Sequence, residues 1–392
     1  MNKEKIWTKD FITASVINFL VFLTHFLLLV TIASYAMDKF HASTSIAGLV
    51  SGIFIIGALI GRLGTGRIIG DIGSKRVLIV STIFFIITSA LYFAAINLQL
   101  LIIIRFLHGF AYGVASTATG TIVAKIIPDK RRGEGIGYYS MSAILAVALG
   151  PFVGIFLIQH ADFKMIFIVA SVLAAISFAI SFVISEPSYE SPDQDQAKDV
   201  KRFQLSNFLE FKAIPISILM LVIGFSYSVV LAFMSLYAKE IHLVEAASFY
   251  FLAYAITVAF SRPFAGRLFD IRGANFVMYP CLFIFAGGML LFSQASHEVT
   301  LLLAGVMVGL GYGNIISCAQ AISVEAVPPQ RLGLATSTFF IFVDLGFGAG
   351  PYLFGSLIPF TGYRGLYLMM VIIILATIPL YHFLHGRKVS FE

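Results

Sequence analysis

Long runs of apolar residues, separated by short polar stretches, recur along the whole chain. A membrane-spanning helix needs roughly 20 consecutive apolar residues. The runs that meet this length are 11–37, 44–65, 77–98, 100–124, 134–158, 165–185, 213–238, 246–266, 276–296, 299–324, 333–358 and 365–385. The first run is too long for the core of a cleaved signal peptide, so we expect it to be retained. The pattern predicts an all-α membrane protein with twelve transmembrane helices.

One polar stretch is much longer than the others. Residues 186–212 carry acids, bases and two prolines, with little apolar content before Phe203. We predict a cytoplasmic linker here, with a short surface helix over 203–211. It would join an N-terminal six-helix bundle, 1–185, to a C-terminal six-helix bundle, 213–392.

The two halves repeat one another at a spacing of 200 residues. The basic, glycine-rich stretch Gly66-Arg67-Ile68-Ile69-Gly70-Asp71-Ile72-Gly73 returns as Gly266-Arg267-Leu268-Phe269-Asp270-Ile271-Arg272-Gly273. Other residues that recur are Arg62, Gly109, Tyr112, Gly113, Pro128, Arg131, Gly133 and Gly150-Pro151, which return as Arg262, Gly309, Tyr312, Gly313, Pro328, Arg331, Gly333 and Gly350-Pro351. Such self-similarity at a fixed period indicates a duplicated structural unit. We therefore expect two pseudo-symmetric bundles related by an axis along the membrane normal.

Composition agrees with a membrane protein: 59% of residues are hydrophobic, 12% are charged and the mean hydropathy is +0.94. Soluble domains carry roughly 25% charged residues. The net charge of +6 does not indicate nucleic-acid binding, because the cations lie in short loops between apolar runs. Cys281 and Cys318 both fall inside apolar runs, so we expect buried thiols rather than a disulfide framework.

The distribution of cations predicts the orientation in the membrane. Of the 26 lysines and arginines, 21 lie on the side of the chain termini, 4 lie in the opposite loops, and Arg105 lies within a run. Loops rich in lysine and arginine stay in the cytoplasm. We expect both termini to be cytoplasmic, in the cell membrane of a bacterium.

Ionisable groups within the spans are candidates for function, because their burial in lipid is costly. Asp344 lies 11 residues into its run, which is about 16 Å along a helix and close to the midplane. A carboxyl group at that depth favours its neutral form until water or a cation reaches it. This suits a group that takes up a proton on one side and releases it on the other. The alternative is a carboxylate held by a neighbouring donor for packing.

Three basic residues in the spans are further candidates for proton coupling. Arg105 lies about 7 Å along its helix from the outer end, so its side chain could extend to the surface. His25 and His108 could titrate near neutral pH. The alternative for each histidine is a hydrogen-bonded packing role.

These motifs together resemble the major facilitator superfamily, over essentially the whole chain. The stretch 66–76 resembles the signature loop after helix 2 of that family, and 266–273 resembles its second copy. Arg105-Phe106-Leu107-His108-Gly109 resembles the helix-4 pattern of proton-coupled members, with His108 in place of a glutamine. Gly150-Pro151-x-x-Gly154 resembles the helix-5 signature of the antiporter, or efflux, branch.

The resemblance implies that the loop is a conformational latch. Its residues here are Gly66, Asp71, Gly73, Lys75 and Arg76, with Asp270 in the second copy. The family places an acid of this loop near the start of helix 11, where the helix dipole favours an anion by roughly 0.3–1 kcal/mol. Asp270 keeps the usual spacing after the first glycine, whereas Asp71 lies one residue beyond it. The role of the acid is therefore either shifted by one residue to Asp71 or shared with Asp270. The alternative is a solvated loop that only sets topology.

Two further sets of residues follow from the resemblance. Proline removes a helix hydrogen bond and glycine permits a bend, so we predict hinges in helices 5 and 11 at Gly150, Pro151, Gly154, Gly350 and Pro351. Helices 1, 4, 7 and 10 line the central cavity in this family. The residues that they offer here are Asn18, Phe22, Tyr112, Phe225, Tyr227, Phe233 and Asn314. These side chains are mainly aromatic with a few polar groups, so a cavity lined by them would suit a bulky amphipathic solute better than a sugar.

We expect a proton-coupled exporter of small amphipathic molecules, a multidrug-type antiporter that works by alternating access. The alternatives are export of one metabolite, such as a siderophore-like metallophore, and, less favoured by Gly150-Pro151, an uptake symporter. An enzyme or receptor is disfavoured, because the sequence has no metal-binding spacing, nucleophile elbow, phosphate loop or soluble output domain. We expect no cofactor and no metal. The expected partners are the solute, protons and the lipid bilayer, with the chain acting as a monomer.

Overall fold

The structure is a computed structural model that describes residues 6–128, 132–185, 209–327 and 332–387. Within these residues, 12 helices are long and apolar enough to cross a membrane, which confirms the predicted fold. They are α1 Lys9–Phe40, α2 Thr44–Ile72, α3 Ser74–Ala90, α4 Leu98–Ile126, α5 Arg132–His160, α6 Phe163–Ser181, α7 Ile214–Glu240, α8 Val244–Arg272, α9 Ala274–Ser293, α10 Glu298–Glu325, α11 Leu332–Gly355 and α12 Ile358–Tyr381. Most of the predicted linker, 186–208, lies outside the described residues, and of 203–211 only 209–211 are described.

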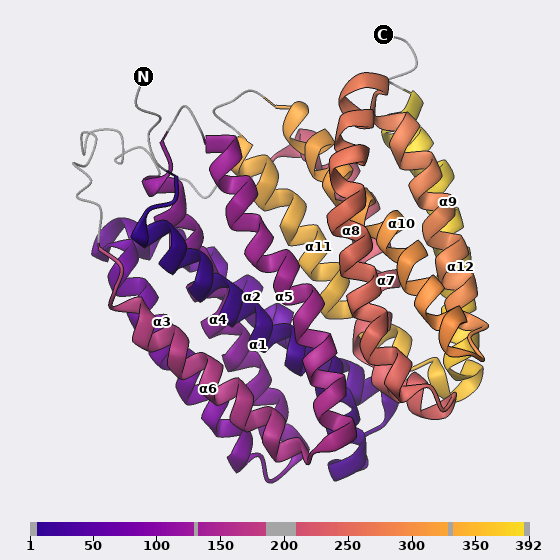
Figure 1. Ribbon diagram of the computed structural model, residues 1–392, viewed down its shortest axis with the longest axis horizontal. Coiled ribbons are helices and arrows are strands. Elements are labelled where there is room, and N and C mark those ends of the chain that lie inside the picture. Colours follow the sequence, from indigo (N-terminus) through magenta and orange to yellow (C-terminus); the bar gives the residue numbers. More distant parts are fainter. Residues whose placement is uncertain (1–5, 129–131, 186–208, 328–331, 388–392) are drawn as a thin grey trace.

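Successive helices run in opposite directions, so their ends gather at two edges of the bundle (Figure 1). The start of α1, the break at Gly73 and the end of α12 lie at one edge, which we call the Gly73 end. The turns at His41 and His242 lie at the other edge, the His41 end. Both histidines adopt a positive φ, 52° and 59°, as they reverse the chain.

The basic stretch 66–76 is not the turn that the sequence suggested. Helix α2 continues to Ile72 and α3 begins at Ser74, so the helical path is interrupted at Gly73 alone. Gly73 has a φ of 88° and its counterpart Gly273 has a φ of 79°. Glycine populates these angles readily, whereas other residues are strained there. The repeat therefore preserves a one-residue helix break.

The two halves lie side by side, α1–α6 on one side and α7–α12 on the other (Figure 1). They meet where α2 packs on α11, α5 on α8 and α1 on α7. Small residues let α2 and α11 approach closely: a Cβ atom at Gly48 or Gly52 would overlap the backbone of Pro351 or Gly348. Close backbone approach through small residues is a main source of helix association in lipid.

Candidate functional site

An ion pair joins the two halves deep in the bundle. The Arg62 guanidinium of α2 donates a hydrogen bond to Asp344 Oδ2 of α11. The Arg62 side chain is 28% exposed and that of Asp344 is 16% exposed, so the pair is only partly buried. The Arg62 guanidinium carbon also lies 5.7 Å from the centre of the Tyr112 ring. Asp344 is therefore held by a donor from the opposite half, at the interface that must change if the halves move.

Sequence reasoning missed the role of Arg62. We treated it as a loop cation, because the basic stretch was expected to follow closely after it. Instead α2 continues ten residues beyond it, to Ile72. The available signal was the repeat itself, since Arg62 returns as Arg262 at the same spacing as the other paired residues.

Arg105 is fully buried, with 0% exposure, and does not extend to the surface. Its Nε donates to the carbonyl of Val50 at 3.1 Å, and a terminal nitrogen donates to the Tyr92 hydroxyl at 3.2 Å. Its guanidinium carbon lies 4.6 Å from the centre of the Phe54 ring. These contacts fix α4 against α2. None of these contacts is with Asp344, so the structure does not bring the two predicted coupling residues together.

The two candidate histidines lie close to this buried arginine. His108 Nδ1 is 3.0 Å from the Tyr92 hydroxyl and its Nε2 is 3.2 Å from Ser89 Oγ. His25 stacks on Phe54, with ring centres 4.3 Å apart, and its Nδ1 has no hydrogen-bond partner among the described residues. Both ring nitrogens of His108 thus have hydrogen-bond partners, as expected for a packing role, whereas Nδ1 of His25 has none among the described residues.

An aromatic cluster lies at the corresponding place in each half. In the first half, Tyr112 packs against His25, with ring centres 5.2 Å apart. In the second half, Tyr312 stacks on Tyr227 at 4.1 Å, and Tyr227 stacks on Tyr254 at 5.5 Å. The rings of both halves come from the helices expected to line the cavity, together with α2 and α8.

The remaining predicted cavity residues differ in their surroundings. Asn18 donates to Ser142 Oγ at 2.8 Å, and Phe22 packs on the Tyr112 ring at 5.1 Å. Phe225 is half-buried, with its ring 6.0 Å from that of Phe354. Phe233 is fully buried near the His41 end. Asn314 donates to Ser261 Oγ at 3.0 Å.

The predicted hinge residues lie inside continuous helices. Pro151 falls within α5 and Pro351 within α11. A Cβ atom at Gly150 would press on α1 near Leu27, and one at Gly154 would press on Leu27 and Thr31; a Cβ atom at Gly350 would press on α7 near Ser228. These glycines therefore allow close packing of α5 on α1 and of α11 on α7. A hinge at these places stays a prediction.

The predicted latch is described only in part. The backbone of α2 includes Gly66 and Asp71, and that of α8 includes Asp270, but the side chains of these residues lie outside the described set. Lys75 and Arg76 lie in the first turn of α3, next to Gly73. The latch role stays a prediction.

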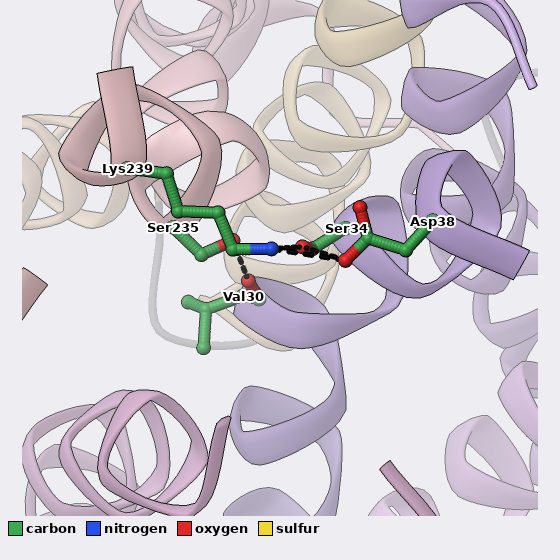
Figure 2. Close-up of polar contacts among 5 residues, drawn as sticks. All are labelled: Val30, Ser34, Asp38, Ser235 and Lys239. Atoms are coloured by element: carbon green, nitrogen blue, oxygen red, sulfur yellow. Dashed lines mark hydrogen bonds and ion pairs between the residues drawn. The ribbon is translucent and has the colours of Figure 1, made fainter. Parts of the chain in front are cut away.

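A polar cluster joins the halves at the His41 end (Figure 2). Lys239 Nζ of α7 donates to Asp38 Oδ2 and to Ser34 Oγ of α1, each at 2.9 Å. Ser235 Oγ donates to the Val30 carbonyl, also at 2.9 Å. These bonds tie α7 to the last turns of α1.

Other hydrogen bonds between the halves lie at the same end. Thr44 of α2 donates to the Gly355 carbonyl of α11, and Gln159 of α5 donates to the Val244 carbonyl of α8. With the Lys239 cluster they tie the two halves together at the His41 end of the bundle. Among the described residues, no group of three or more His, Cys, Asp or Glu side chains could hold a metal ion.

The sequence profile of the Major Facilitator Superfamily matches residues 14–279 and also residues 216–390. The chain belongs to this superfamily. A relative described as an uncharacterized MFS-type transporter of Methanocaldococcus jannaschii is 25% identical over 330 residues, covering 82% of this chain and 84% of that protein. The staphylopine export protein of Staphylococcus aureus is 20% identical over 345 residues, covering 85% and 86%.

A solved structure has the same fold. It is that of a bacterial homolog to the human lysosomal transporter Spinster, in an inward-facing and unoccupied conformation, with a TM-score of 0.78 and 15% identity over 98% of each chain. The chain is thus a multi-pass membrane transporter of the major facilitator fold, a family whose members move small molecules.

Proposed function

We propose that the protein is a proton-coupled exporter of small amphipathic molecules, in which Asp344 carries the proton. The observation that supports this most is the Arg62–Asp344 pair, which links α2 of one half to α11 of the other. In its ionised form Asp344 helps to hold the halves together. Protonation removes that charge, so proton binding and the movement of the halves are linked.

This arrangement favours antiport over symport. A strict antiporter must change conformation when it carries either a proton or a solute, but not when it is empty. An empty, ionised carrier is held in one conformation by the ion pair. The pair is released when Asp344 is protonated, or when a bound solute draws Arg62 away.

The driving force is sufficient for accumulation. A proton that crosses with the membrane potential gains roughly 2.3 kcal/mol per 100 mV, to which a pH difference adds. Since each 1.4 kcal/mol corresponds to about a tenfold change in an equilibrium constant, one proton per cycle concentrates a solute by more than about tenfold.

The predicted topology places the Gly73 end in the cytoplasm of a bacterial cell. In that orientation the bonds at the His41 end would keep the outer side closed, and α5 and α11 would supply the hinges for the opposite state. The latch residues Asp71 and Asp270 would then act at the cytoplasmic side. Arg105 and His108 would have a positioning role, since they fix α4 against α2 and α3.

A dedicated exporter of one metabolite is the second candidate, and the similarity to the staphylopine export protein favours it. The experiment that separates the candidates compares cells that overexpress the protein with cells that lack it. Secreted and retained small molecules are measured without preselection. A multidrug exporter changes the retention of many unrelated amphipathic compounds, a dedicated exporter depletes one, and an uptake system raises the internal level of its solute.

A further inference from the structure

The second half contains an arginine that lacks the partner its counterpart has. Arg262 on α8 corresponds to Arg62 at the spacing of 200 residues, and position 144, which corresponds to Asp344, is an isoleucine. Among the described residues, Arg262 makes no ion pair or hydrogen bond, and its Nε is buried without a partner. A buried guanidinium nitrogen that lacks both an acceptor and a counter-charge is costly to maintain.

The surroundings of Arg262 contain a second unused polar atom. Ser261, its neighbour in the chain, accepts a hydrogen bond from Asn314 Nδ2 of α10 at 3.0 Å. The Asn314 side chain is 3% exposed and its Oδ1 has no partner among the described residues. Buried polar atoms are nearly always paired. The packed helices α8 and α10 therefore leave a charged donor on one and an amide acceptor on the other without partners among the described residues.

Aromatic rings lie on the same two helices. Tyr254 lies about two turns before Arg262 on α8, and Tyr312 lies two residues before Asn314 on α10. Both tyrosines belong to the stacked cluster that Tyr227 completes. Asp344, by contrast, is held by Arg62. By sequence, Asp344 is also the one acid deep within the twelve apolar runs. The apolar runs therefore offer no second deep carboxylate that could neutralise Arg262.

We propose that Arg262 binds the acidic group of the transported solute, and that the solute is an organic anion with an aromatic or otherwise apolar body. This inference rests on the proposed function and specifies its substrate class. The planar guanidinium pairs in bidentate fashion with a carboxylate, sulfonate or phosphate group. Asn314 Oδ1 accepts a hydrogen bond from an N–H or O–H group of the same solute, and the tyrosines of α7, α8 and α10 contact its apolar part.

The test uses three probes with the same fluorescent ring and different charge: dansylglycine, an anion; dansylamide, which is neutral; and dansylcadaverine, a cation. Their affinities for the purified full-length protein in detergent are measured by fluorescence titration. We expect the unmodified protein to bind dansylglycine most tightly. Arg262→Gln should weaken dansylglycine binding by about 10- to 100-fold, the range typical of a lost hydrogen bond to a charged group, and leave dansylamide binding nearly unchanged.

Three further variants keep the test independent of folding defects. Asn314→Asp adds a carboxylate of the same size on α10, the helix that packs on α8, so it should also abolish the preference for the anion. Arg272→Gln removes an exposed arginine from the end of the same helix and should change nothing. Arg262→Lys keeps the charge without the bidentate geometry and should give an intermediate affinity. Each variant is compared by its thermal unfolding midpoint.

The proposal is overturned if the unmodified protein binds dansylcadaverine as tightly as dansylglycine, or binds no anionic probe. It is also overturned if Arg262→Gln weakens all three probes equally while the protein stays folded. Because these are binding measurements without a proton gradient, their failure would leave the assignment of proton coupling to Asp344 intact.

Discussion

Replacing Asp344 with asparagine should shift the protein away from the conformation described here. The substitution preserves the size of the side chain and removes its charge, as permanent protonation would. Arg62 then loses its ionic partner at the contact between α2 and α11. The other bonds between the halves, near the His41 end, remain.

The size of the shift follows from how exposed the pair is. Removing one member of a fully buried pair costs about 3–5 kcal/mol, whereas a surface pair contributes about 0–1 kcal/mol. The side chains of Arg62 and Asp344 are 28% and 16% exposed, between these limits. We therefore expect a change of about 1–3 kcal/mol, which alters the ratio of the two conformations by about 5- to 150-fold.

The shift can be measured as a distance between spin labels. Lys164 and Glu298 are exposed at the His41 end, at the starts of α6 and α10, and belong to different halves. With both native cysteines replaced, labels at these positions should give one distance in the parent protein. Asp344→Asn should add a longer distance, from molecules in which the His41 end has opened.

A double-mutant cycle provides the control. Arg62→Gln should open the same end, and the double variant Arg62→Gln/Asp344→Asn should open it no further than the single variants, because the two residues act through one contact. Glu245→Gln, at an exposed acid of the same end, should have no effect. Additive effects of Arg62→Gln and Asp344→Asn, or an unchanged distance in both, would refute the role of the pair.

Three other predictions follow from contacts of the described residues. Gly52→Ala should open the His41 end, because the added Cβ atom would overlap α11. Gly266→Ala is the control and should not open it, because there is open space around Gly266. The same spin labels measure both effects. Lys239→Gln should shift the free-energy difference between the two conformations toward the opened His41 end by less than about 1 kcal/mol, because the Lys239 side chain is 40% exposed. The difference from the parent should vanish in high salt. Tyr92→Phe should lower the thermal unfolding midpoint, since the buried Arg105 guanidinium loses an acceptor, at a cost of about 1–3 kcal/mol; an unchanged midpoint would contradict this.

The sequence predicted which segments form membrane helices more accurately than it predicted where those helices end. Hydropathy marks where lipid gives way to polar surroundings, but backbone hydrogen bonds continue a helix beyond that point. This is why α2 extends to Ile72 through a basic stretch that was expected to be a turn. The break at Gly73 is a single residue, and hydropathy cannot resolve a feature of that length.

The site was predicted less completely, for a different reason. The depth of Asp344 could be counted along its helix, but its partner could not. Arg62 lies 282 residues away in the chain, and the contact exists only because the two halves pack through α2 and α11. Arg105 was expected to take part in proton coupling, yet it binds carbonyls of α2 within its own half. Local patterns identify buried charges, whereas the packing of the halves decides how they pair.

The central claim, that Asp344 couples proton movement to export, is tested most directly in proteoliposomes. The solute identified from the cell comparison is followed in two assays, accumulation driven by a pH gradient and counterflow without one. We expect Asp344→Asn to retain counterflow and to lose gradient-driven accumulation, because the halves can still move but no charge changes during the cycle. If Asp344→Asn keeps full accumulation driven by the pH gradient, the proton is carried elsewhere and the account is contradicted.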